Sequence, residues 1–223
     1  TVLRAARCQH RDVIRQHGQT RHAVALVKAG WAKWQATGPV DSHNLPPSPL
    51  PETTVAQQQA LDAVLPALDH FGVHLLHGAT GSGKTELYQR LIAATHDRGR
   101  QSLVLIPEIA LTPQIENLFR ARFPDYRIAL LHSGLNNNAR AENWLAAAEC
   151  DLLLGTRLSV FAPLPRLGLI VVDEEHDTSF KQQEGLRYSA RDMAIARAKM
   201  LDIPIVLGSA TPSLESYAQA IQG

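Results

Sequence analysis

Residues 78–85 read Gly78-Ala79-Thr80-Gly81-Ser82-Gly83-Lys84-Thr85 and fit the pattern G-x-x-x-x-G-K-[ST] at every fixed position. The apolar run 73–77 precedes them and a helix-compatible segment begins at Glu86, which is the strand-loop-helix setting that a phosphate-binding loop requires. In such a loop, backbone N–H groups converge on phosphate oxygens, and the start of the helix adds positive partial charge. We expect Lys84 to meet the β- and γ-phosphates and Thr85 to meet Mg²⁺. The alternative is a glycine- and serine-rich turn that binds nothing, and the flanking strand and helix argue against it.

Length and composition place the chain among globular proteins. Its 223 residues, 45% of them hydrophobic, suffice for one large α/β domain or for a medium domain with an appendage. No apolar run approaches the roughly 20 residues of a membrane span, and no charged-then-apolar leader opens the chain, so we expect a cytoplasmic protein without a membrane partner. Cys8 and Cys150 are too few for a four-ligand zinc site or a disulfide scaffold, and we expect both to be reduced. The chain begins at Thr1 and ends at Gly223 directly after a helix-like segment, so we expect it to be a piece of a longer protein.

Charge is distributed unevenly along the chain. Residues 1–52 hold seven Lys and Arg against three Asp and Glu, whereas residues 53–223 hold 15 against 18. The basic N-terminal piece is therefore either a contact for a polyanion or an ordinary solvated helical face.

The composition predicts three parts, namely a small helical segment at 1–38, a proline-rich linker at 39–52 and a domain at 53–223. In the domain, helices are predicted at 55–68, 86–95, 113–123, 139–148, 190–200 and 213–221, and strands at 73–77, 103–106, 128–131, 152–154, 167–172 and 203–207. Near-continuous Val, Ile and Leu strands separated by helices indicate an α/β fold with a parallel sheet covered on both faces.

Polar residues and glycines follow several predicted strands, and ligands gather at the carboxyl ends of strands in such sheets. The strand 167–172 leads into Asp173 and Glu174. A carboxylate at a buried strand end is a suitable Mg²⁺ ligand, which is the role we expect of Asp173, and Glu174 would polarise the attacking water. An acidic run on a solvated turn is the alternative reading.

Two of these strand ends carry a resemblance to a known family. Residues 173–176, Asp-Glu-Glu-His, resemble the DEAD/DEAH-type box of superfamily 2 helicases, and residues 208–212, Gly-Ser-Ala-Thr-Pro, resemble their S-A-T motif. More narrowly, the chain resembles the bacterial primosomal replication-restart helicases from about residue 53 to 223, and 173–192 is the family-specific part. The stretches that carry this resemblance are 78–86, 107–114, 132–135, 155–157 and 173–185. It implies a RecA-like parallel sheet with helices on both faces, preceded by the remnant of a winged helix in 1–38.

The resemblance also implies an ATP and Mg²⁺ site. Its catalytic residues would be Lys84, Asp173, Glu174 and His176, and Ser209 and Thr211 would link the nucleotide site to DNA. The loop from Gly78 to Thr85 would bind ATP, with Thr85 and Asp173 on the metal ion. Gln57 is the one residue of 53–57 that matches the family's adenine-contacting stretch.

The loop 177–187 is similar to the aromatic-rich loop that couples single-stranded DNA to ATP hydrolysis in these helicases. Phe180 and Tyr188 could stack on bases while Lys181 and Arg187 neutralise phosphates, a mode that does not depend on base sequence. The alternative is a surface loop whose aromatic side chains pack inward. Leu186 and Ser189 depart from the family pattern, which often has an aromatic residue and a histidine there. Arg157 is a further candidate for the DNA backbone.

The activity implied is that of an ATP-dependent 3′-to-5′ DNA helicase in replication restart. The implied partners are single-stranded and forked DNA, primosome proteins and single-stranded DNA-binding protein. Zinc is expected only in a missing part of the full-length protein. Two alternatives stay open, another superfamily 2 DNA translocase and a module that binds nucleotide and DNA without turnover because a second motor domain is absent. We expect weak or no unwinding by these residues alone.

Overall fold

The computed structural model describes residues 52–222, and for residue 222 only the backbone. The predicted helical segment 1–38, and the linker 39–52 apart from Glu52, lie outside the described residues. The helices are α4 Val55–Val64, η3 Leu65–Ala67, α5 Lys84–His96, α6 Pro113–Arg122, α7 Asn137–Ala146, η4 Arg157–Phe161, η5 Thr178–Phe180, α8 Ala190–Leu201 and α9 Leu214–Gln222. The strands are β1 Gly72–His77, β2 Gln101–Leu105, β3 Ile128–Leu131, β4 Leu152–Gly155, β5 Leu167–Asp173, β6 Lys181–Gln182, β7 Tyr188–Ser189 and β8 Pro204–Ser209.

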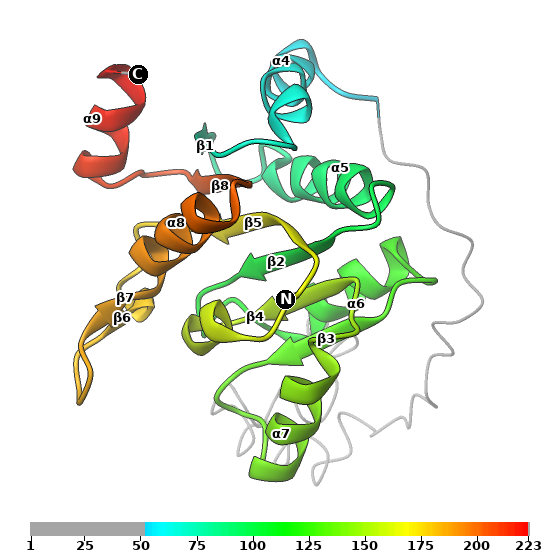
Figure 1. The fold of residues 1–223 in the computed structure, drawn as a ribbon. Helices are drawn as coiled ribbons and strands as arrows, with labels where there is room; N and C mark the ends of the chain where they lie inside the picture. Colours follow the sequence, from blue (N-terminus) through cyan, green and yellow to red (C-terminus); the bar gives the residue numbers. More distant parts are fainter. Residues whose placement is uncertain (1–51, 223) are drawn as a thin grey trace, which may run out of the picture. The chain divides into compact units, whose positions relative to one another are not determined.

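Six of these strands form one sheet in the order β1-β8-β5-β2-β4-β3, and all neighbouring pairs in it are parallel (Figure 1). The predicted parallel sheet is therefore confirmed. Because every strand of the sheet runs the same way, the carboxyl ends of β1, β5 and β8 meet at one edge of it, with β8 between the other two.

Helices cover both faces of the sheet, and successive residues of each strand pack into different cores. On β2, Leu103 and Leu105 belong to one core and Val104 to the other. The first core is covered by α8 and η4, and the second by α4, α5 and α6 (Figure 1). This double burial explains why the central strands read as unbroken apolar runs rather than as alternating ones.

Two local features differ from the sequence prediction. The helix predicted at 55–68 ends at Val64 and continues as a 3-10 turn, because Pro66 has no amide hydrogen to donate and its ring crowds the preceding turn. The segment after the acidic box is not a plain loop, since β6 and β7 pair antiparallel and are joined through residues 183–187, where Gly185 has φ +69. We call residues 181–189 the ribbon.

Side chains buried at the amino ends of the central strands fix the edge of the sheet opposite the phosphate loop. The side-chain amide nitrogen of Gln101, Nε2, donates to the carbonyl oxygens of Ala147, Ala148 and Cys150 at 3.1, 3.2 and 2.6 Å. Cys150 is 2% exposed, and burial raises the pKa of its thiol to about 11.

No helix within residues 52–222 has both the length and the apolar character needed to cross a bilayer.

Asp151 joins β3 and β4 at this edge, because its carboxylate accepts the backbone N–H of Arg127 at 2.9 Å and the guanidinium of the same residue at 3.2 and 3.3 Å. Burial opposes ionisation of Asp151, but the hydrogen bonds from Arg127, together with the electrostatic attraction of Arg127 and His96, outweigh it and lower the pKa of Asp151. A carboxyl group whose pKa is lowered by folding stabilises the fold above the unfolded-state pKa, about 3.9, and this stability is lost as the pH falls through the folded-state pKa.

The Asp151→Asn variant is therefore expected to be less stable than the parent at pH 7, by about 1 to 2 kcal/mol. The difference should shrink as the pH falls below about 4, since the unfolded parent then takes up a proton that the folded parent binds only at lower pH. Urea unfolding at pH 7, 5 and 3.5 measures this, with exposed Asp125→Asn as the control. A stability difference that does not change with pH would contradict the assignment.

Candidate functional site

The phosphate-loop stretch follows β1 and runs into a helix, as predicted, but α5 begins at Lys84 rather than at Glu86, so Lys84 and Thr85 form its first turn. Gly81 and Gly83 have φ +80 and +87, the left-handed region that glycine adopts at no steric cost. Gly83 is also the residue before α5, and no side chain caps the first turn of that helix. The N–H groups at the start of α5 are thus available to an anion.

Lys84 folds back over the loop. Its Nζ donates to the carbonyl oxygens of Gly78 and Ala79 at 2.8 and 3.4 Å and lies 3.9 Å from Oε1 of Glu174. The residue is only 8% exposed. The ammonium group of Lys84 is therefore held by two carbonyl oxygens of the loop and lies near the carboxylate of Glu174. A bound phosphate would replace these oxygens as the partner of the ammonium group.

Gln57 reaches the loop from α4. Its Oε1 accepts the backbone N–H of Thr54 at 2.9 Å, and its Nε2 donates to the carbonyl oxygen of Ser82 at 3.0 Å. A Cβ added to Gly83 would collide with this amide nitrogen. Gln57 thus holds the loop in place, and both ends of its amide group are already used, so the expected contact with adenine would need one of these bonds to break.

Asp173 and Glu174 lie where β5 ends. Tyr88 of α5, which is 1% exposed, donates its hydroxyl to Oδ1 of Asp173 at 2.9 Å. Burial raises the pKa of Asp173 and the charge of Glu174 adds to this, against the Tyr88 hydrogen bond and the charge of Lys84. Glu174 has φ +47, a left-handed conformation that is uncommon outside glycine. Strain of this kind is frequent at functional sites, where surrounding contacts hold it.

His176 connects the acidic box to the strand β8. Its Nδ1 lies 2.8 Å from Oγ of Ser209 and 3.7 Å from Oε2 of Glu174, and its Nε2 lies 3.3 Å from Oγ1 of Thr211. The backbone N–H of Gly78 donates to the carbonyl oxygen of Ser209 at 3.1 Å. The structure thus brings three separately predicted stretches, 78–85, 173–176 and 209–211, into one hydrogen-bonded cluster.

The ribbon begins only a few residues after the acidic box, and the two aromatic residues expected to stack on bases, Phe180 just before the ribbon and Tyr188 within it, differ in how far they are covered. Phe180 is 2% exposed and packs in the core beneath α8 and η4, so the expected base stacking by Phe180 does not fit this structure. Tyr188 is half-buried, and its ring contacts the ring of Phe161 at a centroid distance of 5.2 Å. The apolar side chain that the ribbon does expose is Leu186, at 81%.

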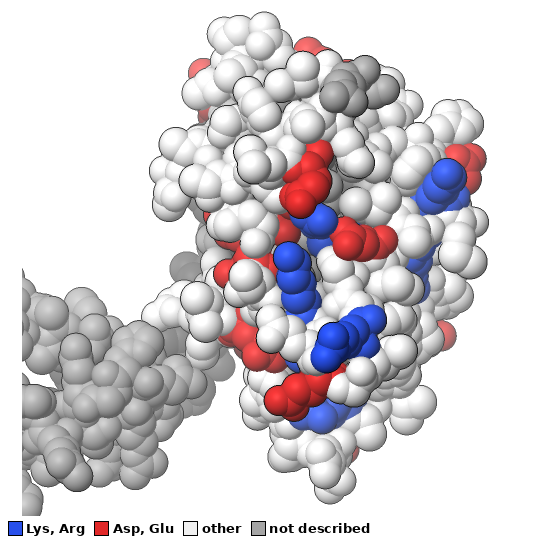
Figure 2. All heavy atoms as spheres, turned by 90° about the vertical axis from the view of Figure 1, so that its left-hand side faces the viewer, with Lys and Arg blue, Asp and Glu red and all other residues white. Residues whose placement is uncertain are grey.

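Basic residues of this region have two kinds of environment. Lys181 and Arg187 are exposed on the ribbon, as a contact with phosphates requires. Arg157 instead donates to the carbonyl oxygens of Ser179 and Lys181 at 3.0 and 3.4 Å and so holds the start of the ribbon. Figure 2 shows Lys and Arg side chains following one another down this side of the molecule, with Asp and Glu side chains between them. The charge there is mixed rather than uniformly basic.

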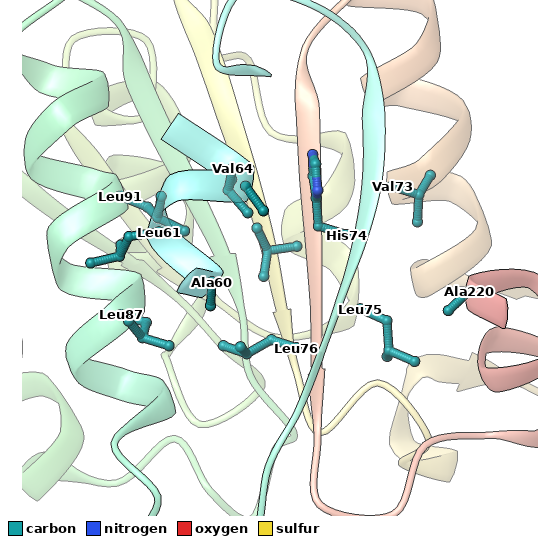
Figure 3. Close-up of a pocket in the computed structure, with 12 residues that line it drawn as sticks. Ala60, Leu61, Val64, Val73, His74, Leu75, Leu76, Leu87, Leu91 and Ala220 are labelled. Atoms are coloured by element: carbon teal, nitrogen blue, oxygen red, sulfur yellow. The ribbon is translucent and has the colours of Figure 1, made fainter. Parts of the chain in front are cut away.

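A separate hollow of about 280 Å³ lies beside β1. Figure 3 shows apolar side chains of α4 and α5 on one side of the strand and Ala220 of α9 on the other. His74 also lines this hollow. Its Nε2 is buried without a hydrogen-bond partner, and burial lowers the pKa of His74. No residue of the phosphate loop lines this hollow, so we do not count it as part of the nucleotide site.

The cluster around Lys84 fits a nucleotide with its metal ion. The loop offers uncapped N–H groups and a buried ammonium for phosphates. Asp173 and the hydroxyl of Thr85 are hard oxygen donors, and Mg²⁺ in such sites takes one or two protein groups together with phosphate oxygens. Glu174 lies 3.9 Å from Nζ of Lys84 and 3.7 Å from Nδ1 of His176, which leaves it beside the ammonium that would bind phosphate.

Sequence reasoning missed two residues of this region. Tyr88 stands four residues after Lys84, one helical turn along α5, and that spacing is the signal that could have found it. The sequence predicts no role for Glu175, yet its side chain is fully buried and hydrogen-bonded to α8 and to residues around the start of α9. Nothing in the sequence distinguishes it from its acidic neighbours.

If Asp173 holds Mg²⁺ as expected, removing the Tyr88 hydroxyl weakens metal binding without removing a ligand. The Tyr88→Phe variant keeps the ring but leaves Oδ1 of Asp173 without its donor. We expect the Mg²⁺ concentration needed for half-maximal nucleotide binding to rise about tenfold, as is common for residues that orient a metal ligand. Nucleotide titrations at several Mg²⁺ concentrations measure this, and an unchanged midpoint would show that Tyr88 only fills space.

Comparison with known proteins agrees with the geometry. A family model described as DEAD/DEAH box helicase matches residues 54–220. The replication restart protein PriA of Bacillus subtilis (strain 168) is 46% identical over 179 residues, which are 78% of this chain and 22% of that protein. PriA of Synechocystis sp. is 49% identical over 174 residues, 76% of this chain and 21% of that protein. This chain thus spans about a fifth of the length of these curated relatives.

Two solved structures share the fold. RecG bound to a three-way DNA junction has a TM-score of 0.52 at 21% identity and covers 90% of this chain and 24% of its own. The Sulfolobus solfataricus SWI2/SNF2 ATPase core in complex with dsDNA has a TM-score of 0.53 at 18% identity and covers 79% of this chain and 36% of its own. These likenesses concern the fold, and they confirm the predicted RecA-like sheet.

Proposed function

Because the chain belongs to the DEAD/DEAH box helicase family, we propose that it is the ATP-hydrolysing motor lobe of a DNA helicase that acts in replication restart. The observation that carries this proposal is the cluster in which Lys84, Glu174 and His176 meet beside Asp173. The names of the curated relatives support replication restart over another superfamily 2 translocase.

Each residue of the cluster has a distinct role in the proposed reaction. Lys84 leaves its carbonyl partners and binds the β- and γ-phosphates, and the loop N–H groups hold their oxygens. Thr85 and Asp173 would hold Mg²⁺, whose charge neutralises the phosphates. Glu174 orients the attacking water and accepts its proton. His176, fixed by Ser209, holds Glu174 at the correct place and connects the site to Thr211.

Single-stranded DNA is the proposed partner of the ribbon. Lys181 and Arg187 would contact phosphates, and Tyr188 with exposed Leu186 would meet bases, while Arg157 steadies the start of the ribbon. The 3′-to-5′ direction, the forked substrate, the primosome proteins and single-stranded DNA-binding protein, and a cytoplasmic location are parts of this proposal that follow from the resemblance. Zinc would belong to a part of the longer protein.

A second candidate is a module that binds nucleotide and DNA without turning over ATP. It is favoured by the share of the relatives' length that the chain spans, about a fifth. Family motors complete the site with an arginine from a second domain, which stabilises charge on the transferred phosphate. We therefore expect weak or no unwinding by this chain alone.

The experiment is an ATPase assay of this chain with and without single-stranded DNA, together with nucleotide titrations. Turnover that DNA stimulates supports the motor lobe, and binding without turnover supports the second candidate. The Lys84→Ala variant is expected to reduce nucleotide affinity at least about tenfold, since it removes a charge-assisted phosphate contact. Lys199→Ala, at an exposed lysine near the end of α8, is the matched control. Undiminished nucleotide binding by Lys84→Ala would overturn the site.

A further inference from the structure

Glu175 is an ionised side chain sealed inside the molecule. Its carboxylate is fully buried and lies 3.0 Å from the guanidinium of Arg191, a residue whose side chain is 18% exposed. Burial opposes ionisation of Glu175, but the N–H of Ser213, the guanidinium of Arg191 and the hydroxyl of Ser216 outweigh it and lower its pKa. The carboxylate is therefore charged at neutral pH and tied to three segments of the chain.

The first of these ties leads to α9. Oε1 of Glu175 accepts the backbone N–H of Ser213 at 2.6 Å, and Oε2 accepts the hydroxyl groups of Ser213 and Ser216 at 3.3 and 3.0 Å. Ser213 directly precedes α9, so the carboxylate sits at the positive end of this helix. Ser213 also follows the Ser209–Thr211 stretch, and the connection therefore steadies the residues that contact His176.

The second tie leads to the ribbon. Arg191 is the second residue of α8, and β7 of the ribbon runs into α8 without a break because Ser189 caps the helix through its hydroxyl. Arg191 donates to Glu175 and to Oγ of Ser213, both at 3.0 Å. Any displacement of the end of β7 must therefore move the partner of Glu175.

The third tie is covalent, since Glu175 stands between Glu174 and His176. The backbone N–H of Glu175 donates to the carbonyl oxygen of Gly208 at 3.0 Å, next to the serine that His176 contacts. Glu174 has the strained backbone conformation described above, so its orientation depends on how its neighbour is held. The side chain of Glu175 thus contacts Arg191 next to the ribbon and Ser213 next to α9, while its backbone is bonded directly to Glu174, the proposed general base.

We propose that the Glu175–Arg191 pair is a positioning link that joins the nucleotide site to the root of the ribbon. Binding at the phosphate loop reorders the ribbon through this pair, and occupancy of the ribbon acts on Glu174 by the same route, because coupling between two sites is reciprocal. Glu175 touches neither nucleotide nor DNA. The part of this proposal that concerns DNA rests on the proposed function, whereas the link itself does not.

The test is hydrogen exchange at the backbone amides of residues 181–192 in the full chain, with and without Mg²⁺ and a non-hydrolysable ATP analogue. In the parent protein, nucleotide should change exchange rates in this segment at least about fivefold, the lower end of typical coupling. In Glu175→Gln this difference should disappear, while nucleotide affinity changes less than about twofold. A pair that merely stabilised the fold would alter exchange with and without nucleotide alike.

Two further variants keep this test decisive. Arg191→Lys retains the charge but cannot donate hydrogen bonds to Glu175, Ser213 and Asp192 at the same time. It should therefore also lose the nucleotide-dependent difference in exchange. This variant keeps the test usable if Glu175→Gln does not fold. Glu116→Gln removes a pair of similar length, 2.8 Å to Arg120 on α6, and should leave the difference intact. A nucleotide-dependent change that persists in Arg191→Lys, or that is absent from the parent protein, overturns the link.

A DNA arm separates this proposal from the proposed function. With a single-stranded oligodeoxynucleotide, the factor by which DNA stimulates ATP turnover should fall at least about fivefold in both link variants, whereas the affinity for DNA measured without nucleotide should not change. A parent protein with nucleotide-dependent exchange at the ribbon but no stimulation by DNA would retain the link and refute the motor function. Stimulation that is undiminished in the folded link variants would refute the link.

Discussion

ATP turnover in Glu174→Gln is expected to fall by a factor of about 10² to 10⁴, the usual contribution of a positioned general base. Glutamine has nearly the shape of glutamate but cannot accept the proton of the attacking water. Nucleotide affinity should be retained or slightly increased, because Lys84 loses a carboxylate 3.9 Å from its Nζ that competes with phosphate. Single-turnover phosphate release, beside a nucleotide titration, separates these two effects.

The matched control for this variant is Glu142→Gln, at an exposed carboxylate on α7 far along the chain from the acidic box. It should leave both quantities unchanged. If Glu174→Gln keeps more than about a tenth of the parent turnover, Glu174 is not the base that the geometry indicates. Loss of nucleotide binding in this variant would instead show that Glu174 supports the phosphate loop through Lys84.

The second large effect concerns stability and arises from one glycine. Gly208 of β8 packs against the buried ring of Tyr88, and a Cβ added there would overlap the tyrosine hydroxyl and lie 2.8 Å from Cζ. Neither partner can retreat, since Tyr88 is 1% exposed and Gly208 belongs to a central strand. We expect Gly208→Ala to lower the free energy of unfolding by about 3 kcal/mol, the upper end of the usual cost of overpacking.

Two comparisons isolate this clash in urea unfolding. Gly99→Ala meets no atom within 4 Å and has only its φ of +71 against it, so it should cost about 1 to 2 kcal/mol. Gly208→Ala combined with Tyr88→Leu should cost less than the sum of the two single changes, because the shortened side chain makes room for the new methyl group. Strict additivity would mean that the strand, rather than Tyr88, rejects the methyl group.

Long periodic features of this fold could be predicted from sequence, and features made by a few residues could not. The apolar runs and the pattern at 78–85 located the central strands and the loop, because a strand buried on both faces needs an unbroken apolar run. The ribbon strands, Lys181–Gln182 and Tyr188–Ser189, are too short to show a period. Pro66 falls within the predicted helix 55–68, although its missing amide hydrogen ends the helix before it.

The contacts inside the site depend on residues far apart in the chain. The spacing from Lys84 places Tyr88 on the same side of α5, but its bond to Asp173 spans 85 positions and that of Glu175 to Ser213 spans 38, so the sequence does not reveal either partner. Phe180 illustrates the same limit, because an aromatic residue in a polar stretch suggests a surface role until the neighbouring helix is seen to cover it. The sequence motifs thus identify candidate catalytic residues such as Asp173, whereas the residues that hold them in place, such as Tyr88, become apparent only from the packed structure.

The thiol of Cys150 offers a different kind of readout. It is buried beneath the sheet edge, contacts the carbonyl oxygen of Ala147 at 3.3 Å, and carries a raised pKa of about 11. A thiol reagent can reach it only when the strands around it separate, since the reactive thiolate is both scarce and covered. In a Cys8→Ser background, the alkylation rate of Cys150 would therefore time the opening of this domain, with no probe added to the protein.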